Sequence, residues 1–270
     1  MKFIFKVLSL SLFFYVSVSS AANKEFPGRD IYLGTEHIEL ITFEKEFSEV
    51  IVVDVRSKYE YQTLRISGAM NIPLNSSRFI SDMKQLRESN AGKKIVVYCN
   101  GKTCMKSYKA ASKCKSRGIT NVVAFDAGIM DWAKTHPEKA VLLGKSPIDP
   151  SKLISKSTFK EHLLAPKAFA ELVNTKDVNV LDVRDRFQRS GLALFVGMEK
   201  QADLDSEETI NQYIKASKAA NKPLLIYDEA GKQVRWLMYR LEAQGVKDYK
   251  FLKGGTRNYF KALKAGKLRI

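Results

Sequence analysis

The chain is poor in the residues that form disulfide frameworks and metal sites. Its 270 residues include only three histidines, isolated from one another, and three cysteines, Cys99, Cys104 and Cys114. So few cysteines, all in one short stretch, exclude a disulfide-stapled exported fold and point instead to thiol chemistry. No group of residues has the spacing of zinc ligands, so we expect no metal. We expect no cofactor either.

Long apolar runs are also absent, except at the start of the chain. There Lys2 and Lys6 precede the run VLSLSLFFYV, and small residues follow in SVSSAA. This order is typical of a secretory signal peptide cleaved after Ala21 or Ala22. The apolar run is short for a membrane span. We therefore expect residues 1–22 to be removed and the mature protein to be periplasmic or secreted, with no stable membrane insertion.

Acidic residues are in the minority. Lys and Arg number 45 against 29 Asp and Glu, a formal charge of +16 that loses two units with Lys2 and Lys6. A positive field of this kind attracts small anions. The lysines are scattered through expected helices and are not interleaved with aromatic residues. We therefore expect no nucleic-acid partner.

The two halves of the chain repeat each other, and such repeats set the architecture. The matching pairs are VIVVDVRSKYEY (50–61) with VNVLDVRDRFQR (178–189), KKIVVYCNGKTCMKS (93–107) with KPLLIYDEAGKQVRW (222–236), and FDAGIMDWAK (125–134) with LKGGTRNYFK (252–261). These matches occur in the same order at nearly one offset. They indicate two tandem domains of the same fold.

Short β-branched runs alternate with helical segments in each half. In the first half, VIVVDV, AMNIP, KIVVYC and NVVAFD predict strands, and 76–89 and 104–118 predict helices. Continuous apolar strands separated by helices are typical of a parallel sheet covered on both faces. The sequence therefore predicts an α/β fold with domains at 32–141 and 157–270, joined by a polar, proline-containing linker at 142–156.

The loop after KIVVYC is a candidate functional site. Cys99 ends this run, and we expect a helix to begin near Cys104. In a parallel sheet, the loop from the carboxyl end of a strand into a helix is the usual ligand position. Gly101 permits unusual backbone angles in the loop. Inward-pointing amides and the positive helix end are expected to lower the pKa of Cys99. The alternative is that Cys99 is an inert core residue.

Both halves resemble the rhodanese (sulfurtransferase) domain. The stretch DVRSKYEYQTLRISGAMNIP is similar to its first signature, YCNGKTCMKSYKAA to its active-site loop and FDAGIMDWAK to its closing motif. The resemblance implies two tandem rhodanese-like domains, and it makes Cys99 the cysteine that carries a persulfide. It implies substrate binding by the loop residues Asn100, Gly101, Lys102, Thr103, Cys104 and Lys106. Asp54 and Arg56 match residues that mainly support the fold.

The resemblance implies a sulfurtransferase that moves sulfane sulfur from thiosulfate, or from a persulfide or polysulfide, to a thiophilic acceptor. The expected partners are a small sulfur-containing anion and a thiol, on a small molecule or a protein. The loop is longer than the common family loop, and Lys106 replaces the usual arginine. Lysine lacks the planar guanidinium with which arginine binds an anion through two hydrogen bonds, so the identity of the sulfur donor stays open.

The second half lacks the nucleophile. Asp228 aligns with Cys99, and no cysteine follows Cys114, so we expect 157–270 to be inactive, with a structural or docking role. Two alternatives to sulfur transfer stay open. One is thiol redox chemistry or handling of chalcogen oxyanions, with Cys104 as a candidate resolving thiol. The other is a binding module without catalysis. Cys114 is expected to be packed in the core.

Overall fold

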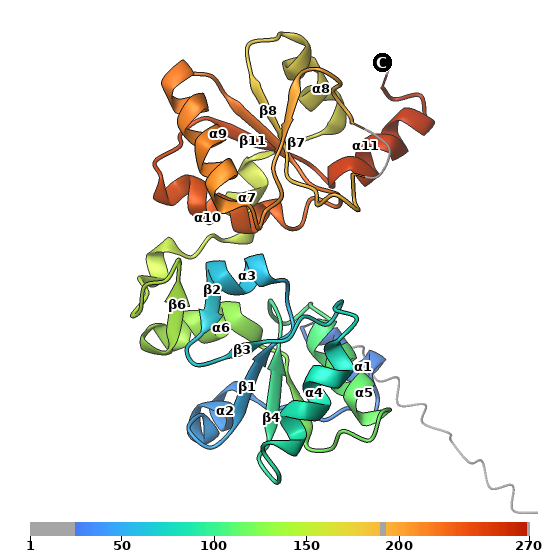
Figure 1. The fold of residues 1–270 in the computed structure, drawn as a ribbon, viewed down its shortest axis with the longest axis vertical. Coiled ribbons are helices and arrows are strands. Elements are labelled where there is room, and N and C mark those ends of the chain that lie inside the picture. The colour runs from blue at the N-terminus through green and yellow to red at the C-terminus, as the bar shows by residue number, and fades with distance from the viewer. Residues whose placement is uncertain (1–24, 190–192, 269–270) are drawn as a thin grey trace, which may run out of the picture.

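The chain folds into two α/β domains, each built on a parallel sheet (Figure 1). The computed structural model describes residues 25–189 and 193–268, so the predicted signal peptide at 1–22 lies outside the described residues. The first sheet has the order β3 (Met70–Asn71), β1 (Ile51–Asp54), β4 (Ile95–Tyr98) and β5 (Val122–Phe125). The second has the order β7 (Leu163–Leu164), β11 (Tyr249–Leu252), β10 (Leu224–Tyr227), β8 (Asn179–Asp182) and β9 (Glu199–Gln201).

The two sheets share one strand order. β1, β4 and β5 correspond to β8, β10 and β11, and β3 corresponds to β9. A parallel bridge between His37 and Ala124 stands where the second domain has β7. The central strands β4 and β10 are buried along their whole length because helices cover both faces. The predicted α/β fold with parallel sheets flanked by helices is therefore confirmed.

Helices lie on both faces of each sheet. In the first domain, α4 (Phe79–Glu88) and α5 (Lys106–Lys115) cover one face, and α2 (Leu40–Glu46) and α6 (Gly128–Thr135) the other. In the second, α8 (Pro166–Asn174) and α11 (Gly255–Lys264) lie opposite α9 (Glu207–Ala220) and α10 (Val234–Ala243). None of the helices within 25–189 and 193–268 is long and apolar enough to cross a membrane.

Shorter elements lie at the edges of the domains. They are α1 (Pro27–Ile31), α3 (Lys58–Thr63), α7 (Lys156–Glu161), two 3-10 turns (Pro137–Lys139 and Pro150–Lys152), and an antiparallel pair of β2 (Leu64–Ile66) and β6 (Ala140–Leu142). The antiparallel pair was not predicted, because each strand has only three residues.

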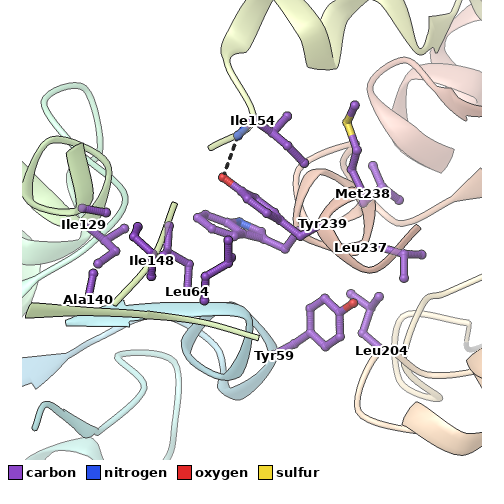
Figure 2. Close-up of a cluster of buried hydrophobic side chains, with 14 of the residues drawn as sticks. Tyr59, Leu64, Ile129, Ala140, Ile148, Ile154, Leu204, Leu237, Met238 and Tyr239 are labelled. Carbon is purple, nitrogen blue, oxygen red and sulfur yellow. Dashed lines mark hydrogen bonds between the residues drawn. The ribbon is translucent and has the colours of Figure 1, made fainter. Parts of the chain in front are cut away.

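An apolar cluster joins the two domains (Figure 2). Helix α3 packs against α10, and buried side chains such as Tyr59, Leu64 and Tyr239 belong to one continuous core. The segment predicted as a linker begins at the end of β6 with Leu142 and is itself partly buried. Within it, the N–H of Ile154 donates to the Tyr239 hydroxyl at 3.1 Å. The segment is therefore packed between the domains and helps to hold them together.

Candidate active site

Cys99 lies directly after β4, at the carboxyl end of the first sheet, and its side chain is fully buried. The loop 100–105 then leads into α5, which begins at Lys106. The sequence predicted that this helix would begin near Cys104. It begins later because the N–H of Cys104 closes a turn on the carbonyl oxygen of Gly101 at 2.7 Å.

Two glycines let this loop lie against the first turn of α6. Gly101 has a φ of +148°, and an added Cβ there would lie 3.2 Å from the carbonyl oxygen of Ala127. Gly128 has a φ of +64°, and an added Cβ would lie 2.5 Å from the nitrogen of Gly101 and 2.6 Å from the oxygen of Cys99. The N–H of Ile129 donates to that same Cys99 oxygen at 3.0 Å. The closing motif therefore holds the loop through backbone contacts that leave no room for a side chain at Gly128.

The Cys99 thiol is enclosed by the loop and the start of α5. It donates to the carbonyl oxygen of Cys104 at 3.1 Å and lies 3.6 Å from the Ser107 hydroxyl. Burial raises the pKa of Cys99 well above its ordinary value, and Cys104 adds to this, while Ser107 acts against it. The expected lowering of the Cys99 pKa was therefore wrong, because desolvation outweighs the surrounding donors.

Cys104 carries the more acidic thiol of the pair. The hydrogen bond from Cys99 lowers the pKa of Cys104 to about 6, and the backbone amides of Lys106 and Asn100 add to this effect against burial. The Cys104 side chain is only partly buried. Of the two thiols, Cys104 therefore loses its proton more readily than Cys99.

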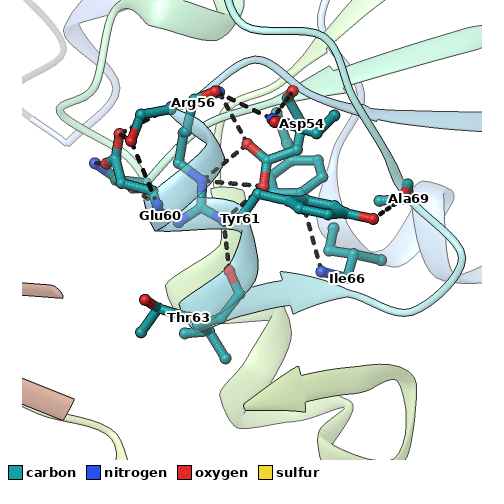
Figure 3. A network of polar contacts seen from close by, with 12 residues as sticks. Asp54, Arg56, Glu60, Tyr61, Thr63, Ile66 and Ala69 are labelled. Carbon is teal, nitrogen blue, oxygen red and sulfur yellow. Dashed lines mark hydrogen bonds and ion pairs between the residues drawn. The ribbon is translucent and has the colours of Figure 1, made fainter. Parts of the chain in front are cut away.

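A polar network holds the loop from the side of α3 (Figure 3). Arg56 pairs with Asp54 at 2.6 Å and donates to Oδ1 of Asn100 at 3.2 Å. Glu60 accepts from Nδ2 of Asn100 at 3.0 Å and from Nζ of Lys106 at 3.3 Å. Burial acts to raise the pKa of Glu60, but Lys106 and Arg56 help to outweigh it, so the pKa is lowered. The side chain of Asn100 thus orients the loop, and its backbone amide helps to lower the pKa of Cys104.

The two remaining polar side chains of the predicted site lie away from the cysteine pair. Thr103 is exposed at the tip of the loop. The ammonium group of Lys102 pairs with Glu25 and, at 3.4 Å, with Asp131. Its hydrogen bond to Glu25 raises the pKa of Lys102. The charge of Lys102 is therefore engaged by carboxylates on the rim of the site.

The part of the chain that carries this site matches a known family. Residues 41–135 match the family model of the rhodanese-like domain. The first domain is a rhodanese-like domain. Its matched stretch includes the cysteine pair, the network around Glu60 and the closing motif at Gly128.

Individual relatives are similar to parts of the chain. The tRNA uridine(34) hydroxylase of Erwinia tasmaniensis is 26% identical over 140 residues, 51% of this chain and 39% of that protein. The one of Cytophaga hutchinsonii is 33% identical over 100 residues, 36% of this chain and 31% of that protein. Among solved structures, the thiosulfate sulfurtransferase from Pseudomonas aeruginosa is 19% identical with a TM-score of 0.34, covering 82% of this chain and 43% of that one. The chain thus spans less than half the length of each relative.

The rhodanese-like domain and the second domain enclose a cleft of about 1160 Å³. Residues 100–106 line it on one side, and 228–233 with Arg235 and Trp236 line it on the other. Eight basic side chains face four acidic ones in this lining, so the cleft is net positive. The guanidinium of Arg56 lies 5.0 Å from the centre of the Trp236 ring. This cation–π contact links the second domain to the network that orients the active loop.

The corresponding loop of the second domain is filled by its own carboxylate. Asp228, at the position of Cys99, is buried and accepts backbone hydrogen bonds from Gln233 at 2.7 Å, Ala230 at 3.0 Å, Val234 at 3.1 Å, and Gly231. Burial raises the pKa of Asp228, and these four amides act against that rise. The inward-pointing amides predicted for such a loop are thus present in the second domain, where Asp228 itself occupies them.

Several residues at the site were missed from the sequence. Ser107 contacts Cys99 from the first turn of α5, and its place eight residues after Cys99 was a usable signal. Glu60 forms a capping box with Ser57, a pattern visible in the sequence, but its link to the loop depends on tertiary structure.

Across the described ranges, no cluster of three or more His, Cys, Asp or Glu could hold a metal ion.

Proposed function

We propose that the chain is a sulfurtransferase that carries sulfane sulfur as a persulfide on Cys99. The main support is the position of Cys99 at the carboxyl end of β4, under a loop and the start of α5, from which Ser107 contacts its sulfur. The rhodanese-like domain supports sulfur transfer as the general type of chemistry. The identity of the donor and acceptor belongs to the proposal.

In this mechanism Cys104 first takes the proton of Cys99 through their shared hydrogen bond. The Cys99 thiolate then attacks the outer sulfur of the donor. The S–S bond of the donor breaks, and its electron pair leaves with sulfite or a thiolate. The Ser107 hydroxyl and the positive end of α5 stabilise the persulfide anion. An acceptor thiolate attacks the outer sulfur and releases Cys99 as a thiolate, which completes two-step covalent catalysis.

The cleft between the domains suits an anionic sulfur donor and a thiol acceptor. Its net positive lining attracts anions. At about 1160 Å³ it also has room for donors larger than thiosulfate, such as a persulfide on an organic thiol or a polysulfide. We include no nucleic acid among the partners. Export to the periplasm or the exterior, without stable membrane insertion, is part of the proposal and rests on the sequence pattern of residues 1–22.

We assign the second domain a structural role. It has no cysteine, and Asp228 occupies the amides of its loop. It contributes one wall of the cleft and the Trp236 ring that packs on Arg56. This role explains why the second domain keeps the fold although it has no nucleophile at the position of Cys99.

The decisive experiment loads the purified protein with thiosulfate or polysulfide and maps the added mass. The wild type should gain one sulfur atom on Cys99, and Cys99→Ser should lose both the label and the turnover. Cys114→Ala is the matched control, because Cys114 is a buried thiol of α5 with no assigned role, and it should keep both. Transfer that persists in Cys99→Ser would overturn the proposal and favour a binding or redox role.

A further inference from the structure

The active loop contains a second thiol next to the first. Cys104 follows Cys99 by five residues, and the Cys99 sulfur contacts the backbone oxygen of Cys104 at 3.1 Å. The two thiols also affect each other's pKa. The backbone of Cys104 therefore lies directly against Sγ of Cys99. Cys114, the third thiol, is buried further along α5, in the same apolar cluster as Cys99.

We infer that Cys104 discharges the Cys99 persulfide when no acceptor arrives, forming a Cys99–Cys104 disulfide and releasing hydrosulfide. This inference rests on the proposed persulfide on Cys99. It adds a second activity to the same loop, in which the protein reduces the bound sulfane sulfur with its own two thiols. Sulfur then leaves as free hydrosulfide and is not handed to an acceptor.

The atoms and electrons of this step balance within the loop. The proton that Cys104 took from Cys99 passes to the outer sulfur of the persulfide. The resulting Cys104 thiolate attacks Sγ of Cys99, and a new S–S bond joins the two side chains. The bond between Sγ and the outer sulfur breaks, and its electron pair leaves with the outer sulfur as hydrosulfide. The sulfane sulfur is reduced, and the two cysteine sulfurs are oxidised to a disulfide. Attack at Sγ follows from the contact between the two cysteines described above.

The surroundings of the pair favour this outcome. The amides of Lys106 and Asn100 stabilise the Cys104 thiolate before attack. The leaving hydrosulfide carries negative charge beside the Ser107 hydroxyl and the amino end of the ten-residue helix α5. The loop between the two cysteines contains Gly101 and an exposed Thr103, so it has no large buried side chain to displace on closing.

The disulfide is returned to the dithiol form by an external dithiol reductant. Cys104 is partly exposed to the cleft, whereas Cys99 is fully buried. An incoming thiolate therefore attacks the Cys104 sulfur and releases Cys99 as the leaving thiolate. The second thiol of the reductant then resolves the mixed disulfide, which restores both cysteines for another donor.

The test follows a preloaded persulfide after the donor has been removed. Full-length wild type, Cys104→Ser and the Cys114→Ala control are each incubated with thiosulfate until mass spectrometry shows sulfur on Cys99. Loading should be slower in Cys104→Ser, which lacks the proton acceptor. The proteins are then desalted and incubated anaerobically without acceptor. In the wild type and in Cys114→Ala, one equivalent of hydrosulfide should appear as the chain becomes two hydrogen atoms lighter than its reduced form. Peptide mapping should place the new disulfide between Cys99 and Cys104. In Cys104→Ser the added sulfur should stay on Cys99, with loss of hydrosulfide release.

The outcomes separate this inference from the proposed function. A wild-type persulfide on Cys99 that persists without hydrosulfide would overturn the inference and leave sulfur transfer intact. Sulfur found on Cys104 would do the same, because it would show attack at the outer sulfur. Hydrosulfide release by Cys104→Ser at the wild-type rate would also overturn it. Failure of both the wild type and Cys114→Ala to take up sulfur would overturn both proposals.

Discussion

Gly128 offers the sharpest test of how the loop around Cys99 is held. In Gly128→Ala the new Cβ would lie 2.5–2.7 Å from backbone atoms of Gly101 and Cys99, at a φ of +64°. The left-handed backbone costs about 1–2 kcal/mol for a residue with a side chain. The forced contacts cost about 1–3 kcal/mol more, as overpacking does elsewhere. We therefore expect a loss of about 2–5 kcal/mol in the free energy of unfolding.

Two matched glycine variants separate the parts of this effect. Gly118 has a similar φ of +72° but no atom within 4 Å of an added Cβ, so Gly118→Ala should lose only the backbone share, about 1–2 kcal/mol. Gly255 is the equivalent of Gly128 in the second domain, with a φ of +61° and an added Cβ 2.4 Å from the oxygen of Asp228. Gly255→Ala should be as destabilising as Gly128→Ala while leaving the Cys99 loop in place.

The assay pairs urea unfolding with the rate of persulfide formation on Cys99. Gly128→Ala should lower both the free energy of unfolding and the rate of persulfide formation. Gly255→Ala should lower only the free energy of unfolding, and Gly118→Ala should lower it only slightly. Equal stability losses at Gly128 and Gly118 would refute the contact argument. Equal losses of persulfide formation at Gly128 and Gly255 would refute the claim that Gly128 acts directly on the active loop.

Three further predictions test the loop, the interface and the thiol pair. Glu60→Gln should lose about 1.5–3 kcal/mol of unfolding free energy at neutral pH. Because the folded pKa of Glu60 is lowered, this loss should shrink as the pH falls below the ordinary carboxyl pKa, and a pH-independent loss in urea titrations would contradict it. Tyr239→Phe removes the acceptor of the buried N–H of Ile154 and should cost about 1–3 kcal/mol, whereas an unchanged unfolding midpoint would show that the hydrogen bond is dispensable. Iodoacetamide should label Cys104 first, at a rate that reaches half its maximum near a pH of about 6, and labelling that follows an ordinary thiol pKa would exclude the charged pair.

Most of the fold could be predicted from the repeat between the two halves of the chain. All four apolar runs of the first half form strands, because continuous burial on both faces leaves a strong apolar signal. The boundaries were less accurate. The strand predicted at AMNIP shrinks to Met70–Asn71, and the helix predicted from 104 begins at Lys106. The late start of the helix comes from the turn that the N–H of Cys104 closes on Gly101, a local hydrogen bond that a pattern of apolar residues does not record.

The chemistry of the site was harder to predict than its location. The sequence placed Cys99 after the strand and before the helix, where the structure also has it. It did not predict which thiol has the lower pKa, because Cys99 is buried in an apolar cluster with residues of α4 and α5 that are distant in the sequence or brought together only by the fold. Asn100 was predicted to bind substrate, yet its side chain is held by Arg56 and Glu60, which are distant in the sequence.

Asp228 makes the second loop a site with a tethered ligand. A carboxylate fixed by its own backbone competes with free anions at an effective concentration that no dissolved anion of the same kind reaches. Two similar loops line one net positive cleft, and the amides of the second loop are occupied by Asp228. For the proposed sulfurtransferase, an anionic donor that enters the cleft would therefore meet only one loop with free amides, the loop of Cys99. Asp228 would thus set where the donor binds without taking part in the reaction.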